Sequence, residues 1–412
     1  MSLYAQYLET IKNPFQKTCR LRFLQPDGST AFALDDNYQR KSNKAFIADG
    51  SLTVNLQNGQ RRSASIALDN VNDQYEYAYN KMWFGQEIAL DEGVILPNGE
   101  PYYIPQGVFL LTNPESVLSP SGKTASYSLV DKWANLDGTL YGNLDGTYVV
   151  DAGTNIFNAI ASLLLEDKGN GRVLDATTPV FTSYYNGMTV TLPNGSTTYY
   201  INAPYDLSVE AGSSLAEVVK GLCDMVAAWV GYDAYGALRI DPSQDDISDA
   251  TKPVLWTFSQ AEAQLLGLSY SAKNTDVYND VQIVGDQLDD YSQPTARAKN
   301  YDPKSDTNIN LIGRKTFREE KSGYATATQC RDYATWKLKR TTVLQKSVQI
   351  SCSQILHLQE NSLVEVVRTD KKSKPTERHL IQGFSRPLIG NSPMTIDAIS
   401  VNDFPDITVT TS

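Results

Sequence analysis

The sequence is poor in the side chains that most often carry out catalysis. It has two histidines and four cysteines in 412 residues. His357 lies between two leucines and His379 begins an expected strand, and neither belongs to a nucleophile motif such as G-x-S-x-G. No P-loop, G-x-G-x-x-G or H-E-x-x-H pattern occurs. These absences argue against the common hydrolase, nucleotide-binding and zinc-protease classes, and we expect a protein that is not an enzyme.

The cysteines are scattered, with no C-x-x-C pair and no nearby histidine, at Cys19, Cys223, Cys330 and Cys352. This spacing signals neither a zinc site nor a disulfide framework, so we expect buried free thiols in a protein made in a reducing cytoplasm. We expect no membrane span, because no run reaches ~18 apolar residues, and no secretion signal. No cofactor and no metal are predicted.

Positive charge is scarce relative to negative charge. The 36 Lys and Arg residues face 47 Asp and Glu residues, which gives a net charge of −11. Nucleic-acid affinity comes largely from cations that neutralise phosphates, so the sequence predicts no specific nucleic-acid binding. An acidic wall would instead repel a polyanion that passes along it.

What the sequence has in quantity is β-strand pattern. The stretch Tyr103 to Asp131 reads as two strands joined by a Pro/Ser/Gly turn, and His379 to Ser400 has the same arrangement. Each stretch contains a Gln-Gly pair followed by an aromatic residue: Gln106, Gly107 and Phe109 in the first, and Gln382, Gly383 and Phe384 in the second. This echo predicts a duplicated module in which these six residues mark equivalent strands.

Further strands are expected on both sides of these stretches. Residues 15–131 read as five to seven strands of a barrel or sandwich. Within them we expect strands at 19–24, 45–55, 61–68 and 87–90, and later in the chain at 268–271, 277–284, 343–352 and 363–367. Residues 285–308 have almost no aliphatic side chains and are expected to form an exposed loop, and 403–412 a polar tail.

Three helices are expected. The first spans Thr154 to Asp167, with Thr154 as its cap, and the last spans 323–340. The second begins at Ser214, which has capping-box spacing to Glu217, and its apolar stripe continues to Trp229.

Two short patterns invite a functional interpretation. The NLDGT sequence occurs at 135–139 and again at 143–147, but the D-x-D-x-D-G run of a calcium loop is missing, so consecutive turns are the better prediction. A hairpin at 232–242 carries Tyr232, Asp233 and Tyr235, which would either pack in the fold or contact a glycan.

The order of these patterns resembles that of the baseplate or tail-tip hub proteins of tailed bacteriophages and related contractile injection particles. The resemblance covers nearly the whole chain, and it rests on the order of degenerate motifs: RRSASIAL, WFGQEIAL, QGVFLL, TASYSLVDKWANLDG, AGSSLAEVVKGLCDMVAAWVGYDAYGALRIDP, VYNDVQIVG, NSLVEVV, HLIQGFSRPLIG and MTIDAIS.

The resemblance implies a mainly β fold with an α+β insertion. Two β-barrel modules similar to tail-tube proteins would flank the insertion, at 1–135 and 251–412, with 136–250 between them. The second module would carry one helix and the polar tail.

The resemblance also implies a structural role in the virion tail. Three copies would place six barrels in a ring that matches a sixfold tail tube to a threefold spike or fibre and lines the conduit for DNA and the tape measure. The implied partners are the tail tube, distal tail, tape-measure and spike or fibre proteins. Many relatives carry a lytic domain after the second barrel, whereas this sequence ends at Ser412, soon after the strand expected to close at Ser400.

Two alternatives remain open. The protein would otherwise be a receptor- or carbohydrate-binding tail protein that uses its tyrosine-rich hairpins, or a cell-wall glycan hydrolase with unrecognised carboxylates.

Overall fold

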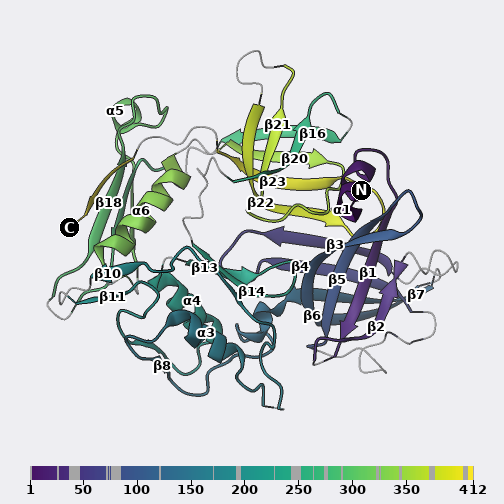
Figure 1. Cartoon of the computed structure of the whole chain (residues 1–412), viewed down its shortest axis with the longest axis horizontal. Helices are drawn as coiled ribbons and strands as arrows, with labels where there is room; N and C mark the ends of the chain where they lie inside the picture. The colour runs from purple at the N-terminus through teal and green to yellow at the C-terminus, as the bar shows by residue number, and fades with distance from the viewer. Residues whose placement is uncertain are drawn as a thin grey trace.

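The computed structural model has a mainly β fold with few helices (Figure 1). It describes residues 2–25, 27–36, 47–70, 73, 75, 85–119, 122–169, 171–191, 196–226, 228–242, 252–262, 264–272, 277–288, 291–321, 324, 326–342, 346–370, 376–401 and 407–411. The predicted domain boundary at 250 lies outside the described residues. Among the helices that are described, none is long and apolar enough to cross a membrane.

A 13-stranded sheet, here called the main sheet, holds most of the strands. Its first seven strands are β1 (Lys17–Leu24), β2 (Thr30–Asp35), β3 (Ile47–Asn55), β4 (Arg62–Asp69), β5 (Glu87–Ile95), β6 (Pro101–Ser119) and β7 (Gly122–Asp131). The other six are β15 (Val254–Ser259), β16 (Leu265–Ala272), β20 (Lys346–Cys352), β21 (Leu363–Val367), β22 (Thr376–Pro387) and β23 (Met394–Ser400). Across the described strands the sheet runs from β16 to β2 without closing on itself.

The main sheet contains the same strand order twice. The first unit, residues 17–131, runs β3-β4-β7-β6-β5-β1, and the second unit, drawn from residues 254–400, runs β16-β20-β23-β22-β21-β15. Six strands of the first unit therefore have counterparts in the second, and β2, which pairs with β1 at the end of the sheet, has none among the described strands. The last pair differs, because β1 lies antiparallel to β5 whereas β15 lies parallel to β21.

The cross-strand pairs extend this correspondence to single residues. In β6, Leu110 pairs with both β5 and β7, and in β22, Leu380 pairs with both β21 and β23. An irregularity follows the first residue of β3 and of β16 in the same way, at Ala48 and Leu266, where each strand has one residue more than its partner. The two units therefore share a register as well as an order.

One hydrophobic core serves both units. Its buried members include Phe23 and Phe109 from the first unit and Phe258 and Phe384 from the second. The units are joined in the sheet by β22, whose second part, Gly383 to Pro387, pairs antiparallel with β3. At about 25 cal/mol per Å² of apolar surface, this shared core is expected to dominate the stability of the joint.

The central lobe, residues 132–242, follows β7 and has a hydrophobic core of its own. Its helical elements are η1 (Lys132–Asn135), α3 (Ile156–Leu164) and α4 (Leu215–Met225). Its short strands are β8 (Tyr148–Val150), β9 (Val180–Phe181), β10 (Thr189–Thr191), β11 (Thr197–Tyr199), β12 (Leu207–Val209), β13 (Ala228–Tyr232) and β14 (Leu238–Pro242). Each of the helices α3 and α4 buries one apolar side, and these two sides pack together in this core.

The α6 lobe consists of residues 277–342, which are inserted between β16 and β20, and of residues 407–411, which follow β23 and pair with β18. Its four-stranded sheet has the order β19-β17-β18-β24 and packs against the long helix (Figure 1). Its elements are β17 (Asp280–Val284), β18 (Thr295–Asn300), α5 (Ile309–Ile312), β19 (Thr316–Glu320), α6 (Ala327–Thr342) and β24 (Ile407–Thr411). In the first unit the corresponding position is the short Asn58-Gly59 turn between β3 and β4.

The N-terminal helix α1 (Leu3–Thr10) contacts both units. In the first unit, the Tyr7 ring packs against Tyr102 of β6 with centroids 5.4 Å apart. The Tyr7 hydroxyl lies 3.0 Å from His357 Nδ1, and both side chains also stack edge to face. Gln264 donates a hydrogen bond to the Ile11 carbonyl at 3.0 Å. The helix therefore ties the two units together at a second place.

Several predicted elements need correction. Residues 285–308 are not all loop, because β18 pairs on both sides; its inward residues Ala296 and Ala298 are too small to give an aliphatic signal. Part of the predicted tail forms β24, which pairs with β18, and 402–406 lie outside the described residues. The second helix ends at Met225, and Trp229 lies on β13, because a short apolar run fits a buried strand as well as a helix.

The predicted caps also differ. Asn155 rather than Thr154 caps α3, with its side chain accepting the Asn158 N–H at 3.0 Å. Ser214 does occupy the N-cap position of α4, but its side chain makes no capping hydrogen bond.

Candidate functional site

The two predicted Gln-Gly pairs both lie at β-bulges. Gln106 is the extra residue between β5 and β6, and Gln382 is the extra residue between β22 and β23. The bulges are therefore on opposite flanks of the corresponding strands. The register matches Leu110 with Leu380, so the two Gln-Gly pairs do not occupy matching positions along the two strands. That the six residues mark equivalent strands of two barrels stays a prediction.

Both glycines lie where a side chain would not fit. A Cβ on Gly107 would approach the Phe109 ring to 2.6 Å, and its φ of +150° is itself unfavourable for other residues. A Cβ on Gly383 would lie 2.6 Å from Asn55 Oδ1 and 2.8 Å from the Val54 carbonyl oxygen, at the joint with β3. Phe109 and Phe384 are buried in the shared core.

A buried ionic cluster lies between the two units. Glu92 of β5 forms ion pairs with Lys17 at 2.5 Å and with Arg386 of β22 at 2.6 Å, and all three side chains are almost fully buried. Arg386 also donates to Gln106 Oε1 at 2.5 Å. Burial acts to raise the pKa of Glu92, but the neighbouring cations Arg386 and Lys17 outweigh it and lower this pKa.

Burial has the opposite consequence for the lysine. It lowers the pKa of Lys17, and the negative charge of Glu92 only partly compensates. The cluster is therefore held together by close charge pairing in a dry environment, which makes the loss of any one partner costly.

Another buried cation, Arg62, connects three parts of the chain. Arg62 of β4 donates to the carbonyl oxygens of Gln106 at 3.0 Å and of Tyr232 at 3.4 Å, and to Gln359 Oε1 at 2.7 Å. It also forms an ion pair with Glu360 at 2.5 Å. The first unit, the central lobe and the second unit therefore all contact one guanidinium group.

At the same place, hydrogen bonds of the Asn58-Gly59 turn join the first unit to the backbone of the central lobe. The Gly59 N–H donates to the Val230 carbonyl at 2.8 Å, and Asn58 Oδ1 accepts the Val230 N–H at 2.9 Å. Gly231 then lies directly against Arg61, where a Cβ would be 2.3 Å from the Arg61 Nε atom.

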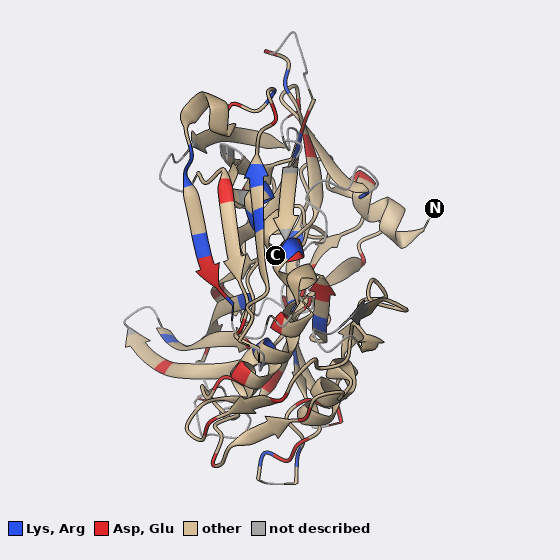
Figure 2. Ribbon diagram, turned by 90° about the vertical axis from the view of Figure 1, so that its left-hand side faces the viewer, with Lys and Arg blue, Asp and Glu red and all other residues tan. Residues whose placement is uncertain are grey.

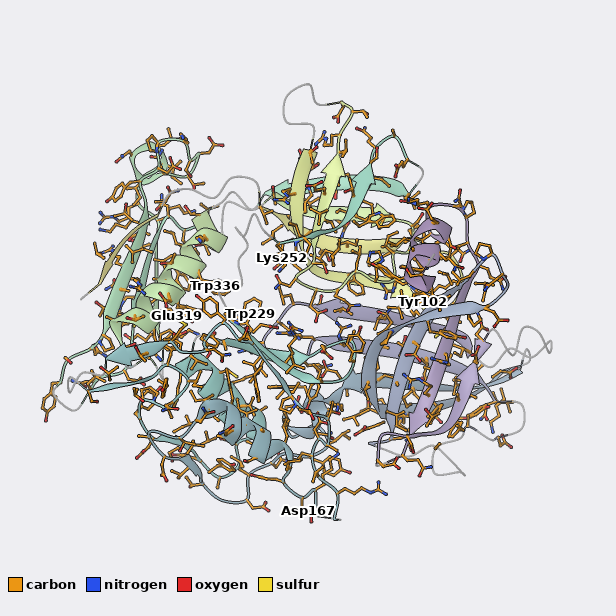
Figure 3. The ribbon with its side chains drawn as sticks, in the orientation of Figure 1. Tyr102, Asp167, Trp229, Lys252, Glu319 and Trp336 are labelled. Carbon is orange, nitrogen blue, oxygen red and sulfur yellow. The ribbon has the colours of Figure 1, made fainter. Side chains whose placement is uncertain are left out.

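A pocket of about 340 Å³ opens beside this meeting point. It is lined by residues of all three parts: Leu56, Arg61, Arg62, Trp229, Asp233, Ala234, Tyr235, Arg239, Asp241, Pro242, Lys252, Gln359, Glu360 and Asn361. Figure 3 labels two of them, Trp229 from the central lobe and Lys252, which directly precedes the second unit. Burial lowers the pKa of Arg61, and the Glu360 carboxylate opposes that effect.

The pocket brings two of the three predicted glycan residues to its wall. Tyr235 is 73% exposed, whereas the Asp233 carboxylate accepts the N–H groups of Tyr235 and Ala237 and so shapes the turn. Tyr232 is fully buried, with the Lys132 ammonium 5.2 Å from its ring centre. Tyr232 therefore lies in the core of the lobe rather than on a surface that a glycan reaches.

The central lobe also contacts the α6 lobe next to the pocket. The rings of Trp229 and Trp336 meet edge to face with centroids 5.5 Å apart, as the labelled side chains show (Figure 3). Gln329 donates a hydrogen bond to the Met225 carbonyl at the end of α4.

The remaining candidate groups for chemistry are dispersed. Burial lowers the pKa of His357, which lies between the Tyr7 hydroxyl and the Leu255 carbonyl. His379 is fully buried and lies 3.5 Å from Glu377. Each of the four cysteines is a buried free thiol. Among the described residues, no group of three or more His, Cys, Asp or Glu side chains is placed to hold a metal ion.

The sequence alone did not identify Arg62 and Glu92 as buried charges, although their positions within the strands indicated burial. Arg62 precedes Ala64, Ile66 and Leu68 with a period of two, and Glu92 lies between Leu90 and Val94 in the same way. Alternation therefore placed both charges on the core-facing side.

No family model matches the sequence, and no curated protein is significantly similar to it. Solved structures are similar over nearly the whole chain. The 43 kDa tail protein of prophage MuSo2 from Shewanella oneidensis is 11% identical, with 93% of this chain and 98% of that chain covered and a TM-score of 0.56. The chain has a phage tail protein fold.

Two further structures support this statement. The tail protein from Neisseria meningitidis MC58 is 9% identical, with 94% of this chain and 97% of that chain covered and a TM-score of 0.58. The prophage tail protein gp18 from Listeria monocytogenes EGD-e is 9% identical, with coverages of 93% and 94% and a TM-score of 0.52. At these identities the likeness is one of fold.

Proposed function

We propose that the protein is a structural hub of a phage or phage-like tail, located in the baseplate or tail tip of the virion. It would form a trimer in which each chain supplies two barrel-like modules, at 1–135 and 251–412, with 136–250 outside the ring. Its role would be architectural and would need no catalysis.

The observation that carries this proposal is the duplicated strand order of the main sheet, with its matched register. A trimer of chains with two equivalent units each has six units, which is the number needed to match a sixfold tube to a threefold spike or fibre. The likeness to prophage tail proteins supports the same role.

The proposed partners follow from this position. The tail tube protein would stack on the ring from one side, the spike or fibre from the other, and the distal tail and tape-measure proteins would contact its rim and lumen. DNA would pass through the conduit without specific binding, because the chain carries a net charge of −11 and repels a polyanion.

Native mass spectrometry of the purified protein, alone and mixed with the tube protein of the same tail, tests this function. We expect a trimer, and a complex of one trimer with a sixfold ring of tube protein. A chain that stays monomeric at micromolar concentration and does not join the tube would contradict the hub.

The second candidate is a carbohydrate-binding tail protein. The observation that favours it is the exposed Tyr235 at the mouth of a pocket that also holds Asp233 and Trp229. An aromatic face beside hydrogen-bonding groups is suited to a sugar ring.

Glycan-array binding that is lost in Tyr235→Ala would support this second function. Tyr199→Ala is the matched control, because Tyr199 is also exposed but does not line the pocket. Equal binding by both variants would count against a glycan site at this pocket.

A further inference from the structure

The buried ionic cluster between the two units contains two cations and one carboxylate. Charged residues of both signs lie at scattered positions along the ribbon (Figure 2), but the side chains of Lys17, Arg386 and Glu92 are at most 2% exposed. Among the described residues, Glu92 is the only carboxylate that pairs with either cation. The cluster therefore has one positive charge in excess, at a place where an uncompensated charge is costly.

The lysine of this cluster also contacts a side-chain amide. Lys17 Nζ donates hydrogen bonds to Gln354 Oε1 and, at 2.5 Å, to the Pro387 carbonyl oxygen. Lys17 begins β1 in the first unit, whereas Gln354 follows β20 in the second unit, 337 positions further along the chain. A buried amine of one unit therefore lies against a carboxamide of the other.

Backbone groups hold this carboxamide in one orientation. Gln354 Nε2 donates to the Ser392 carbonyl at 2.8 Å and to the Gly390 carbonyl at 3.3 Å, so its Oε1 atom faces Lys17. Gln354 is 3% exposed, which leaves water little access to its Cδ atom. Two groups that can react and are held together in this way gain a large rate advantage over the same groups in solution.

Glu92 is placed to accept a proton from the amine. Its Oε1 atom lies 2.5 Å from Lys17 Nζ, and its Oε2 atom lies 2.6 Å from Arg386 Nε. Burial lowers the pKa of Lys17 although Glu92 opposes this effect, and the charge of Arg386 lowers it further. These influences favour the neutral amine, which is the nucleophilic form of lysine.

We propose that Lys17 and Gln354 form an intramolecular isopeptide bond, with Glu92 as the catalytic base. The ion-paired arrangement in the structure is the state before the reaction. The neutral Nζ atom attacks Gln354 Cδ, and the π electrons of the carbonyl move onto Oε1. Glu92 takes a proton from Nζ and passes it to Nε2. The Cδ–Nε2 bond then breaks, its electron pair leaves with the nitrogen as ammonia, and Oε1 regains its double bond.

The products explain why the step is favourable. The new amide nitrogen carries no charge, so Glu92 is left with Arg386 as a balanced ion pair. The released ammonia has a way out, because Gln354 lines a pocket of about 280 Å³ whose wall also includes Leu266, a residue that is 56% exposed.

The bond joins the two units covalently. It links residues 337 positions apart, and so restricts the unfolded chain strongly. Each chain reacts once, so the step is a self-modification and needs no substrate. The inference concerns a single chain and does not depend on the hub role.

Mass spectrometry of the denatured full chain tests the bond directly. After overnight incubation of the folded protein, we expect a mass about 17 Da below that of the sequence, which is the mass of the ammonia lost. Trypsin should release residues 13–20 joined to residues 347–368, because it does not cleave after an acylated lysine. A chain that keeps its full mass and gives 13–17 and 347–368 as separate peptides would overturn the proposal.

Two glutamine variants locate the reacting amide. Gln354→Met keeps the volume of the side chain but removes the carboxamide, and should abolish the mass loss. Gln86→Met is the matched control, because Gln86 is also 3% exposed and its amide donates to the Leu24 carbonyl at the other end of β1 from Lys17. It should lose ammonia as the wild type does, and the same loss in Gln354→Met would overturn the assignment.

Two carboxylate variants test the base. Glu92→Gln should slow the cross-link at least a hundredfold, which is the usual contribution of a positioned base. Asp91→Asn is the matched control, because Asp91 is 2% exposed and pairs with Arg20 and Arg22 instead of Lys17. Circular dichroism confirms that both variants are folded. Cross-linking of Glu92→Gln at the rate of the wild type would overturn the role of Glu92.

Discussion

Arg386 and Glu92 form an ion pair that is sealed from solvent. Their Nε and Oε2 atoms lie 2.6 Å apart, and both side chains are 0% exposed. Arg386 belongs to the second unit and Glu92 to the first, so this pair spans the joint between the units. Loss of this pair should weaken the contact between the two units more than it weakens either unit alone.

Removing one partner of this pair is expected to be severe. Arg386→Met leaves the Glu92 charge buried with Lys17 alone, and should lower the free energy of unfolding by about 3–5 kcal/mol. Urea denaturation followed by tryptophan fluorescence measures this loss. The double variant E92Q/R386M should lose less than the sum of the single variants, and additive losses would show that the pair is not coupled.

The same carboxylate predicts a pH dependence. The cations hold the folded-state pKa of Glu92 below its ordinary value of 4.5, so the stability that Glu92 contributes is present above pH 4.5 and is lost as the pH falls through the depressed pKa. The difference in unfolding free energy between wild type and Glu92→Gln should therefore shrink below about pH 4.5. A difference that stays constant down to pH 3 would contradict this assignment.

The joint between β22 and β3 should not tolerate a side chain at Gly383. In Gly383→Ala the new Cβ would meet a carbonyl oxygen of β3 at 2.8 Å, and backbone cannot move aside as a flexible side chain can. We expect a loss of about 1–3 kcal/mol in unfolding free energy. Gly267→Ala, whose Cβ would lie 3.6 Å from its nearest neighbour, is the matched control and should be nearly neutral.

The helix caps of the central lobe provide another matched pair. Asn155→Ala removes the side chain that accepts the Asn158 N–H, and should destabilise the protein by about 0.5–2 kcal/mol. Ser214→Ala should change the unfolding free energy by less than about 0.5 kcal/mol, because Ser214 makes no capping hydrogen bond. Thermal melts of both variants decide the matter, and equal losses would refute the assignment of the caps.

Sequence reasoning could predict the local elements of this fold because strand alternation is a local signal. The stretch 103–131 forms β6 and β7 as expected, and 379–400 forms the corresponding pair β22 and β23. The two Gln-Gly pairs lie on β6 and β22. The echo gave a different register from that of the strand pairs, because similar residues occupy bulges on opposite flanks.

The parts that could not be predicted depend on distant contacts. Nothing local to Ala296 and Ala298 indicates that α6 covers them, and nothing local to Trp229 indicates that it meets Trp336. The pocket beside Arg62 is likewise formed by three segments that lie far apart in the chain. Such features follow from how the lobes pack, which composition and spacing do not specify.

The docking of α1 on the second unit has a consequence for synthesis on the ribosome. Tyr7 and its partner His357 are separated by 350 positions. At 5–20 residues per second, roughly 20–70 s pass between the translation of the two residues. During that interval Tyr7 can pack against Tyr102 of β6, with ring centroids 5.4 Å apart, but α1 lacks its contacts with His357 and Gln264. A chaperone that binds this nascent segment would protect the protein before its two halves can meet.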